Sequence, residues 1–294
     1  MTFDEIIYKR LTEKEELTSK LAKYAGKPAV FYQTAPDDKQ EQAWGKEQYP
    51  RIVFTIDLRA DQERKTAGVL QADLYCDESH TAPEQIAPLI RDCLTNLILK
   101  PDGSSHYAFA WASTEMFYLS GSSGVSTRID GATMRFDILE YVEQYTSNPD
   151  PAEAVLMCLK SLVPDGAVIG IDKIAPYYEP SGERPAFYVR INSHKTNRQT
   201  YAITWVDCAI SVHVITADSD MRIKWVRFLS DYFNRAGEVG MTDGSPMLIF
   251  GTTADNTTDY LSKGQITLNA QYSLPRVSVL EHPLNHMGYT KKFE

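Results

Sequence analysis

The 294-residue sequence is poor in cysteine and contains no long apolar run. Its four cysteines are Cys76, Cys93, Cys158 and Cys208. They are widely spaced and lie on apolar segments, which is typical of buried thiols in a reducing compartment and not of a disulfide framework. Because about 18 consecutive apolar residues occur nowhere, no helix is expected to cross a bilayer. The amino end also lacks the basic start and apolar stretch of a secretory signal, so we expect no export.

The sequence has fewer basic than acidic residues. The chain has 30 Lys and Arg against 39 Asp and Glu, which gives a formal net charge of −9. Tight generic DNA binding needs a broad basic face, so this balance argues against it, although an acidic wall would let DNA pass without adhering. The shares of apolar residues (43%) and charged residues (23%) are ordinary for a globular protein. We therefore expect a soluble, folded chain.

Motifs that carry enzymatic or metal chemistry are missing as well. Residues 120–124 are rich in glycine and serine but lack the Gly-Lys-Ser/Thr ending of a phosphate-binding loop. His282 and His286 are four residues apart, yet Pro283 lies between them and no third metal ligand is adjacent. The polar residues Asp77, Glu78 and His80 are more typical of a turn before a helix than of a general base. We predict no catalytic residue, no cofactor and no metal.

What the sequence does contain is an internal duplication. In both halves an amphipathic helix precedes a strand and an Ala-Pro pair. A proline then leads into an alternating apolar strand, with Pro50 in the first half and Pro185 in the second, an offset of 135 residues. Long strands follow at 69–76 and 203–215, and each is followed by a second helix. Two closing strands end each half.

The second helix of each half has an apolar stripe that we expect to be buried. Its members are Ile86, Leu89, Ile90, Cys93, Leu94 and Leu97 in the first half, and Trp225, Phe228, Leu229, Tyr232 and Phe233 in the second. A strand is also expected at 168–174. These patterns predict the α+β class, with two tandem similar domains that are each a mainly antiparallel sheet with helices on one face. The predicted domains are residues 1–146 and 151–275, joined by a proline-containing polar linker, and residues 276–294 form a C-terminal arm.

One part of the pattern resembles a known family. The stretch Ala29-Val30-Phe31-Tyr32-Gln33-Thr34-Ala35-Pro36, a charged loop, and Tyr49-Pro50-Arg51-Ile52-Val53-Phe54 resemble the tail terminator, or tail completion, proteins of tailed bacteriophages. The resemblance covers the first half to about Glu140 and, more loosely, the second half from Pro151 to Leu274. Members of that family commonly have one such domain, so the duplication is a departure.

The resemblance implies a structural virion protein and not an enzyme. Such a protein forms a ring on the last ring of the tail tube, stops its polymerisation and joins the tail to the neck or head. The implied partners are further copies of the chain, the tail tube protein, a neck or head-completion protein and the tail sheath, while DNA passes through the lumen. Assembly would take place in the host bacterial cytoplasm. Six chains per ring are favoured, and three two-domain chains remain an alternative.

Long polar loops and the C-terminal arm are the expected contact surfaces with another subunit or the tube. The residues concerned are Arg59, Asp61, Glu63, Arg64, Lys65, Leu280 and Phe293. Two other kinds of function stay open. One is another neck or connector protein, or the cap of a contractile phage-tail-like particle. The other is a two-domain ligand-binding protein or enzyme that uses the cleft between its domains.

Overall fold

The computed structural model describes residues 1–37, 41–44, 47–58, 66–77, 81–103, 105–119, 128–143, 147–174, 176–256 and 260–276. The helices are α1 (Phe3–Glu13), α2 (Glu15–Thr18), α3 (Glu41–Trp44), α4 (Pro83–Leu94), α5 (Pro151–Leu162), α6 (Ser219–Ala236) and α7 (Tyr260–Lys263). The strands of the first half are β1 (Lys23–Tyr24), β2 (Lys27–Pro28), β3 (Val30–Tyr32), β4 (Arg51–Leu58), β5 (Gly68–Asp77), β6 (Ile98–Leu99), β7 (His106–Leu119) and β8 (Ile129–Tyr141). Those of the second half are β9 (Ala167–Val168), β10 (Tyr177–Tyr178), β11 (Ala186–Gln199), β12 (Ile203–Ile215), β13 (Glu238–Gly240), β14 (Pro246–Ala254) and β15 (Ile266–Pro275).

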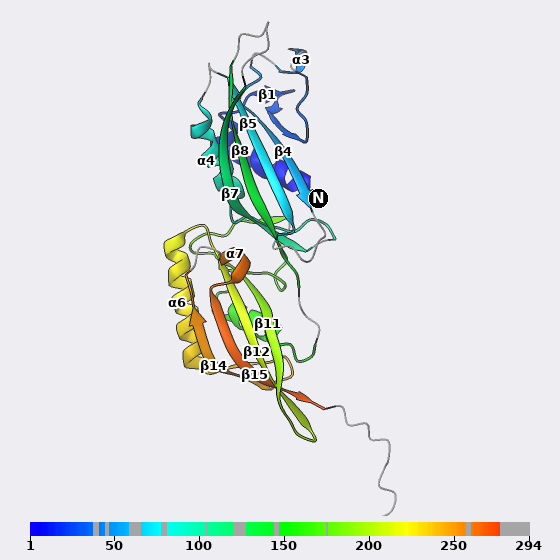
Figure 1. The fold of residues 1–294 in the computed structure, drawn as a ribbon, viewed down its shortest axis with the longest axis vertical. Helices are drawn as coiled ribbons and strands as arrows, with labels where there is room; N and C mark the ends of the chain where they lie inside the picture. Colours follow the sequence, from blue (N-terminus) through cyan, green and yellow to red (C-terminus); the bar gives the residue numbers. More distant parts are fainter. Residues whose placement is uncertain are drawn as a thin grey trace, which may run out of the picture.

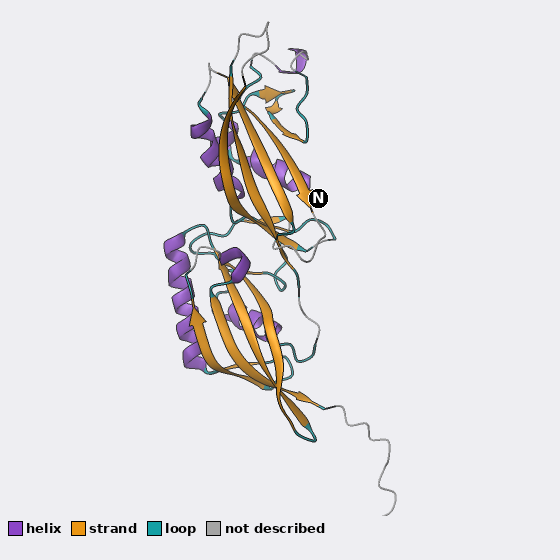
Figure 2. Ribbon diagram, viewed as in Figure 1, coloured by secondary structure: helices purple, strands orange, loops and turns teal. Residues whose placement is uncertain are grey.

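Two similar α+β domains follow one another along the long axis of the molecule, which confirms the predicted fold class (Figures 1 and 2). Leaving out β10, the first sheet has the order β6-β7-β8-β5-β4-β3. The second has the order β13-β14-β15-β12-β11-β9. When the six strands of each sheet are numbered in chain order, both sheets have the strand order 4-5-6-3-2-1. The two topologies are therefore identical.

Details of the pairing strengthen this equivalence. The first strand of each sheet is parallel to its neighbour, as β3 is to β4 and β9 is to β11, while all other pairings are antiparallel. A β-bulge interrupts the register between Trp111 and Ser113 on β7, and another lies between Ile249 and Gly251 on β14. Because bulges are specific local features, their recurrence on equivalent strands supports descent of both domains from one duplicated domain.

Local sequence explains where the main helices begin and end. Thr2 and Glu5 form a reciprocal capping box at the start of α1, which satisfies two otherwise unpaired N–H groups. The Asp218 carboxylate accepts hydrogen bonds from the Asp220 and Met221 N–H groups at the start of α6. Gly237 ends that helix with a φ of 68°, a left-handed conformation that glycine adopts without steric cost.

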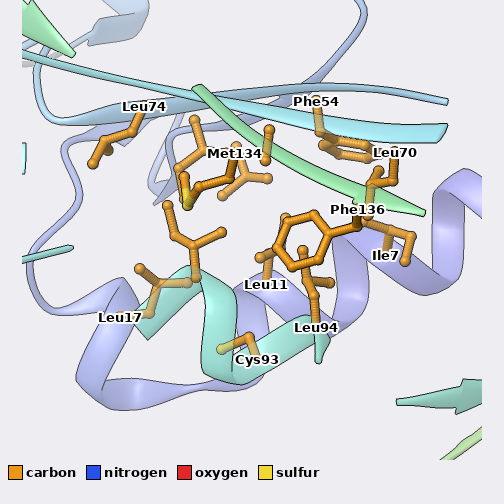
Figure 3. Packing of buried hydrophobic residues seen from close by; sticks show 14 of the residues in the cluster. Ile7, Leu11, Leu17, Phe54, Leu70, Leu74, Cys93, Leu94, Met134 and Phe136 are labelled. Carbon is orange, nitrogen blue, oxygen red and sulfur yellow. The ribbon is translucent and has the colours of Figure 1, made fainter. Parts of the chain in front are cut away.

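The helices cover one face of each sheet and bury an apolar core. In the first domain, Leu11 of α1 and Leu94 of α4 pack against Leu70, Met134 and Phe136 of the sheet (Figure 3). The second core is built in the same way from α5, α6 and the inner face of β11, β12 and β15. Cys76, Cys93 and Cys208 are buried free thiols as expected, whereas Cys158 is only partly buried.

Two details of the second domain differ from the prediction. Phe228 is 47% exposed, because the buried stripe of α6 consists of Val226, Leu229, Ser230 and Phe233 and so faces away from it. A strand was expected at 168–174, but the observed strand β9 is shorter and comprises only Ala167 and Val168. The chain then turns, with the Asp172 N–H donating to the Val168 carbonyl.

A third cluster of buried residues joins the domains end to end. It brings together Ile98, Ala108, Leu139 and Tyr141 of the first domain with Ala167, Ile169, Ile174, Ala186, Tyr188, Ile215 and Leu261 of the second. The strand β10 crosses this junction, since Tyr177 and Tyr178 pair with β6 and extend the sheet of the first domain. The Tyr188 hydroxyl donates to the Val142 carbonyl at 2.8 Å. The two domains therefore share a packed interface and a strand pairing.

Candidate assembly surfaces

The long strand β7 leaves most of its outer side uncovered. It pairs with β6 only through Tyr107 and Ala108, and the Phe109 carbonyl accepts a hydrogen bond from the Asn96 N–H. Beyond Phe109, no strand in the described part of the chain pairs with this side of β7. The main-chain N–H and C=O groups of such an edge can pair with a strand of another chain.

The equivalent strand of the second domain has the same arrangement. β14 pairs with β13 from Pro246 to Leu248, and the Ile249 N–H donates to the Gly237 carbonyl at 2.8 Å. From Phe250 to Ala254, the outer side of β14 meets no other strand among the residues that the structure describes. The duplication therefore gives the chain two equivalent uncovered edges, which lie on the same lateral side in Figure 1.

An uncovered edge also lies on the opposite side of the second sheet. β9 pairs with β11 only at Ala186 and Phe187. Beyond Ile191, the hairpin of β11 and β12 extends away from the body of the domain, and every side chain from Asn192 to Thr200 is exposed. Figure 1 shows this hairpin projecting at the end of the molecule remote from the first domain. The second domain thus has one accessible strand edge on each side.

Aromatic side chains mark the two equivalent bulges. Trp111 is 44% exposed and Phe250 is 65% exposed. The Trp111 ring is held in place, because its Nε1 donates to Thr114 Oγ1 at 3.0 Å and the Arg91 guanidinium lies 5.5 Å from the ring centre. A large aromatic ring fixed at the surface of an uncovered edge is typical of a protein contact residue.

Other apolar side chains share this lateral side. Eight of the fourteen large apolar residues that are exposed in the described part belong to β7, α6 or β14. They are Trp111, Met116, Tyr118, Leu119, Ile223, Phe228, Leu248 and Phe250. Singly exposed apolar residues are normal on monomers, but their accumulation along one side indicates a surface that is covered in an assembly.

Polar chemistry in the described part of the chain is mostly structural. No group of three His, Cys, Asp or Glu residues there is placed to hold a metal ion. A cavity of about 680 Å³ beside α5 is lined by Lys160 and Asp172, but these two form an ion pair at 2.9 Å, and Lys160 also donates to the Pro164 and Gly166 carbonyls. Lys160 and Asp172 therefore hold the turn after α5 together.

His106 is an unusual buried polar residue. Its side chain is 1% exposed at the start of β7, beside Tyr141, and neither ring nitrogen has a hydrogen-bond partner among the described residues. Burial, together with the positive charge of Lys100, lowers its pKa to about 4, while Glu143 acts in the opposite direction. The imidazole is therefore neutral near pH 7 and fills space next to the domain junction.

The contact residues predicted from the sequence lie outside the described residues. This holds for Arg59, Asp61, Glu63, Arg64 and Lys65, between β4 and β5, and for Leu280 and Phe293, after β15. Sequence reasoning missed the aromatic residues at the bulges. The run Leu248-Ile249-Phe250 in one strand was a signal, because simple alternation cannot bury all three side chains. Trp111 gave no such signal, since it continues the alternation from Phe109.

No protein-family model, curated protein or solved structure matches the chain. None of the helices in the described part is long and apolar enough to cross a membrane. The uncovered edges, the aromatic residues at the bulges and the apolar lateral side all favour contacts with other protein chains.

Proposed function

We propose that this chain is a structural virion protein of a phage tail that forms a ring at the head-proximal end of the tail. The ring terminates polymerisation of the tail tube and joins the tail to the neck or head. The observation that carries the proposal is the pair of equivalent uncovered edges, β7 and β14, with an exposed aromatic ring at the bulge of each. Strands that remain uncovered in a monomer can be completed by neighbouring subunits, and a rotation that closes gives a ring.

The arrangement of the domains supports six chains per ring over three. A ring of three chains with six domains side by side would require the two domains of a chain to meet edge to edge. They meet end to end instead, through the cluster around Tyr141, Tyr188 and Leu261. β7 and β14 lie on one lateral side, and β4 and β11 on the other (Figure 1). Six copies could therefore meet along both domains at once and form two stacked layers.

The tail tube protein and a neck or head-completion protein are the proposed axial partners, with the tail sheath as a further partner in a contractile tail. The C-terminal arm, residues 276–294, is proposed to dock on a neighbouring subunit or on the tube. DNA would pass through the lumen without specific binding, and the protein would act in the virion after assembly in the host cytoplasm.

Light scattering and negative-stain microscopy of the purified chain, alone and with tube polymer encoded beside it, test the proposal. We expect a closed ring and tubes capped at one end. A protein that stays monomeric at micromolar concentration, even with tube present, would contradict it. Capture of a head-completion protein without tube would instead favour another neck or connector protein, and a tube cap that binds no neck protein would favour a contractile tail-like particle.

A ligand-binding protein or enzyme that uses the interdomain cleft is the second candidate. The cavity of about 680 Å³ beside α5 has the size of a ligand pocket and borders the junction cluster at Ala167, Ile174 and Tyr178, so it is the site that such a ligand would use. The cavity beside Tyr141, Tyr188 and Arg190 has a volume of about 190 Å³, below the usual range of about 300 to 1,000 Å³ for ligand pockets. Stabilisation of a monomer by a small ligand would favour this candidate.

A further inference from the structure

Two segments at opposite edges of the second sheet carry opposite charge. The segment from Gly237 to Asp255, which contains β13 and β14, has three carboxylates and no basic residue. The carboxylates are Glu238, Asp243 and Asp255, and all three are exposed. The Asp243 carboxylate accepts hydrogen bonds from Ser245, which lower its pKa. The β13–β14 segment is therefore acidic, whereas α6, which flanks it on the same side in Figure 1, carries four basic and two acidic residues.

The strand β11 on the other side contains basic residues and no acidic one. Arg190, His194, Lys195 and Arg198 belong to it, and Arg276 joins them by donating to the Thr200 carbonyl at 3.1 Å. Asp207 is the nearest carboxylate on β12, and its oxygens accept hydrogen bonds from Asn197 and Gln271. Among the described residues, neither Lys195 nor Arg198 forms an ion pair, so both charges face solvent.

The register of the sheet places opposite charges at the same height. Lys195 lies opposite Asp207, Asp207 opposite Gln271, and Gln271 opposite Leu248, which in turn pairs with Glu238. Lys195 and Glu238 therefore occupy the two ends of one row across the sheet. If a second copy were placed beside the first at the same height, Lys195 of one chain would approach Glu238 of the other.

Strand direction fits the same arrangement. The strands β11, β12, β15, β14 and β13 are successively antiparallel, so the edge strand β13 runs in the same direction as β11. When copies are related by rotation about an axis along the strands, β13 of one copy meets β11 of the next in parallel orientation, as β9 meets β11 within the chain. An isologous contact would instead bring two acidic sides or two basic sides together, which like-charge repulsion disfavours.

We propose that the chain associates head to tail with a second copy of itself, through the acidic β13–β14 side of one second domain and the basic β11 edge of the next. This inference rests on the proposed ring and specifies its subunit contact. The outer main-chain groups of β13 and β11 supply the pairing, and the opposite charges set its polarity and register.

A charge-swap experiment tests the contact. Lys195→Glu with Arg198→Glu makes the β11 edge acidic, and Glu238→Lys with Asp243→Lys makes the β13–β14 side basic. Each double variant alone should assemble at least about tenfold more weakly than the unaltered chain. An equimolar mixture of the two should recover the ring, and so should the chain that carries all four changes. The control Lys23→Glu with Lys27→Glu, on the exposed β1–β2 hairpin, alters the net charge by the same amount as the β11 variant and should assemble normally.

The outcomes separate this contact from the proposed function. If both double variants form unchanged rings, the proposed contact is wrong although the ring is not. The same conclusion follows if the variants assemble more weakly and their mixture does not restore the ring. Loss of retention on a DNA column by Lys195→Glu with Arg198→Glu, with assembly unchanged, would assign the basic edge to nucleic acid instead. An unaltered chain that never assembles would refute the proposed function as well. Far-ultraviolet circular dichroism shows whether each variant is folded.

Discussion

The Tyr260 hydroxyl of the second domain donates a hydrogen bond to the side-chain oxygen of Asn96 in the first. Asn96 is buried and has a φ of 63°, and the Arg222 guanidinium stacks 3.8 Å from the centre of the Tyr260 ring. Together with the Tyr141 hydroxyl, which donates to the Leu261 carbonyl at 3.1 Å, this contact ties α7 to the first domain. The junction is therefore held by polar contacts as well as by apolar packing.

Tyr260→Phe tests the contribution of this contact. The substitution keeps the aromatic ring under Arg222 but removes the partner of a buried carboxamide, which typically costs about 1 to 3 kcal/mol. We expect a loss of that size in the free energy of unfolding, measured with urea. Tyr201→Phe removes a hydroxyl from a side chain that is 87% exposed and should leave the free energy of unfolding unchanged. Equal effects of the two substitutions would show that the Asn96 contact contributes nothing.

Leu94→Ala tests the first core. Leu94 is fully buried on α4, where it packs against the sheet (Figure 3), so truncation should leave a cavity and lower the free energy of unfolding by about 2 to 5 kcal/mol. Leu119→Ala, on an exposed part of β7, serves as the control and should change it by less than about 0.5 kcal/mol. A Leu94→Ala protein as stable as the control would mean that α4 does not pack as described.

His106 predicts a pH dependence of stability. Its pKa is about 4 in the folded chain and near 6.5 when unfolded, so the unfolded state binds more protons between these values. The free energy of unfolding should therefore be unaffected by His106 above pH 6.5. As the pH falls toward 4, protonation of the unfolded state should lower this free energy by at most roughly 3 kcal/mol. We expect His106→Leu to reduce the difference in unfolding free energy between pH 7 and pH 4.5. The exposed His194, replaced by Leu, provides the control, and identical pH profiles for both variants would contradict the prediction.

The aromatic residues at the bulges should matter for assembly and not for folding. Trp111→Glu and Phe250→Glu place a charge on surfaces that we propose to be covered in the ring, where an unpaired charge is costly to desolvate. We expect smaller particles by light scattering and an unchanged circular dichroism spectrum. Met157→Glu on α5, also at an exposed apolar position, is the matched control. Rings that persist in both bulge variants would exclude these residues from the contact.

Periodicity was enough to predict the class of fold and most of its main elements. The stripe of Ile86, Ile90 and Leu94 and the alternating strand after Pro185 correspond to α4 and β11, because burial of one face imposes a regular period on the sequence. The predicted stripe of α6 was right at Leu229 and Phe233 but wrong at Phe228, since Phe228 and Leu229 are both apolar and the pattern alone does not decide which of them faces the sheet. Local periodicity also contains no information on β10, which pairs with a strand about 80 residues earlier in the chain.

The surfaces were harder to predict than the core. An exposed aromatic residue such as Phe250 has the same identity as a buried one, and only the neighbouring strands show that its edge is uncovered. The opposite charges at the two edges of the second sheet can be related to each other only through the register, which brings Lys195 and Glu238 into one row. These are long-range relationships that no single sequence window contains.

The pairing of β10 with β6 has a consequence for biosynthesis. Domains of multidomain chains generally fold as units as they leave the ribosome, the amino-terminal one first. Here the sheet of the first domain receives its last strand, Tyr177–Tyr178, only after the helix α5 and the turn that follows it have been translated. A nascent chain paused between the domains would expose the outer side of β6. Translation past Tyr178 therefore precedes completion of the first domain.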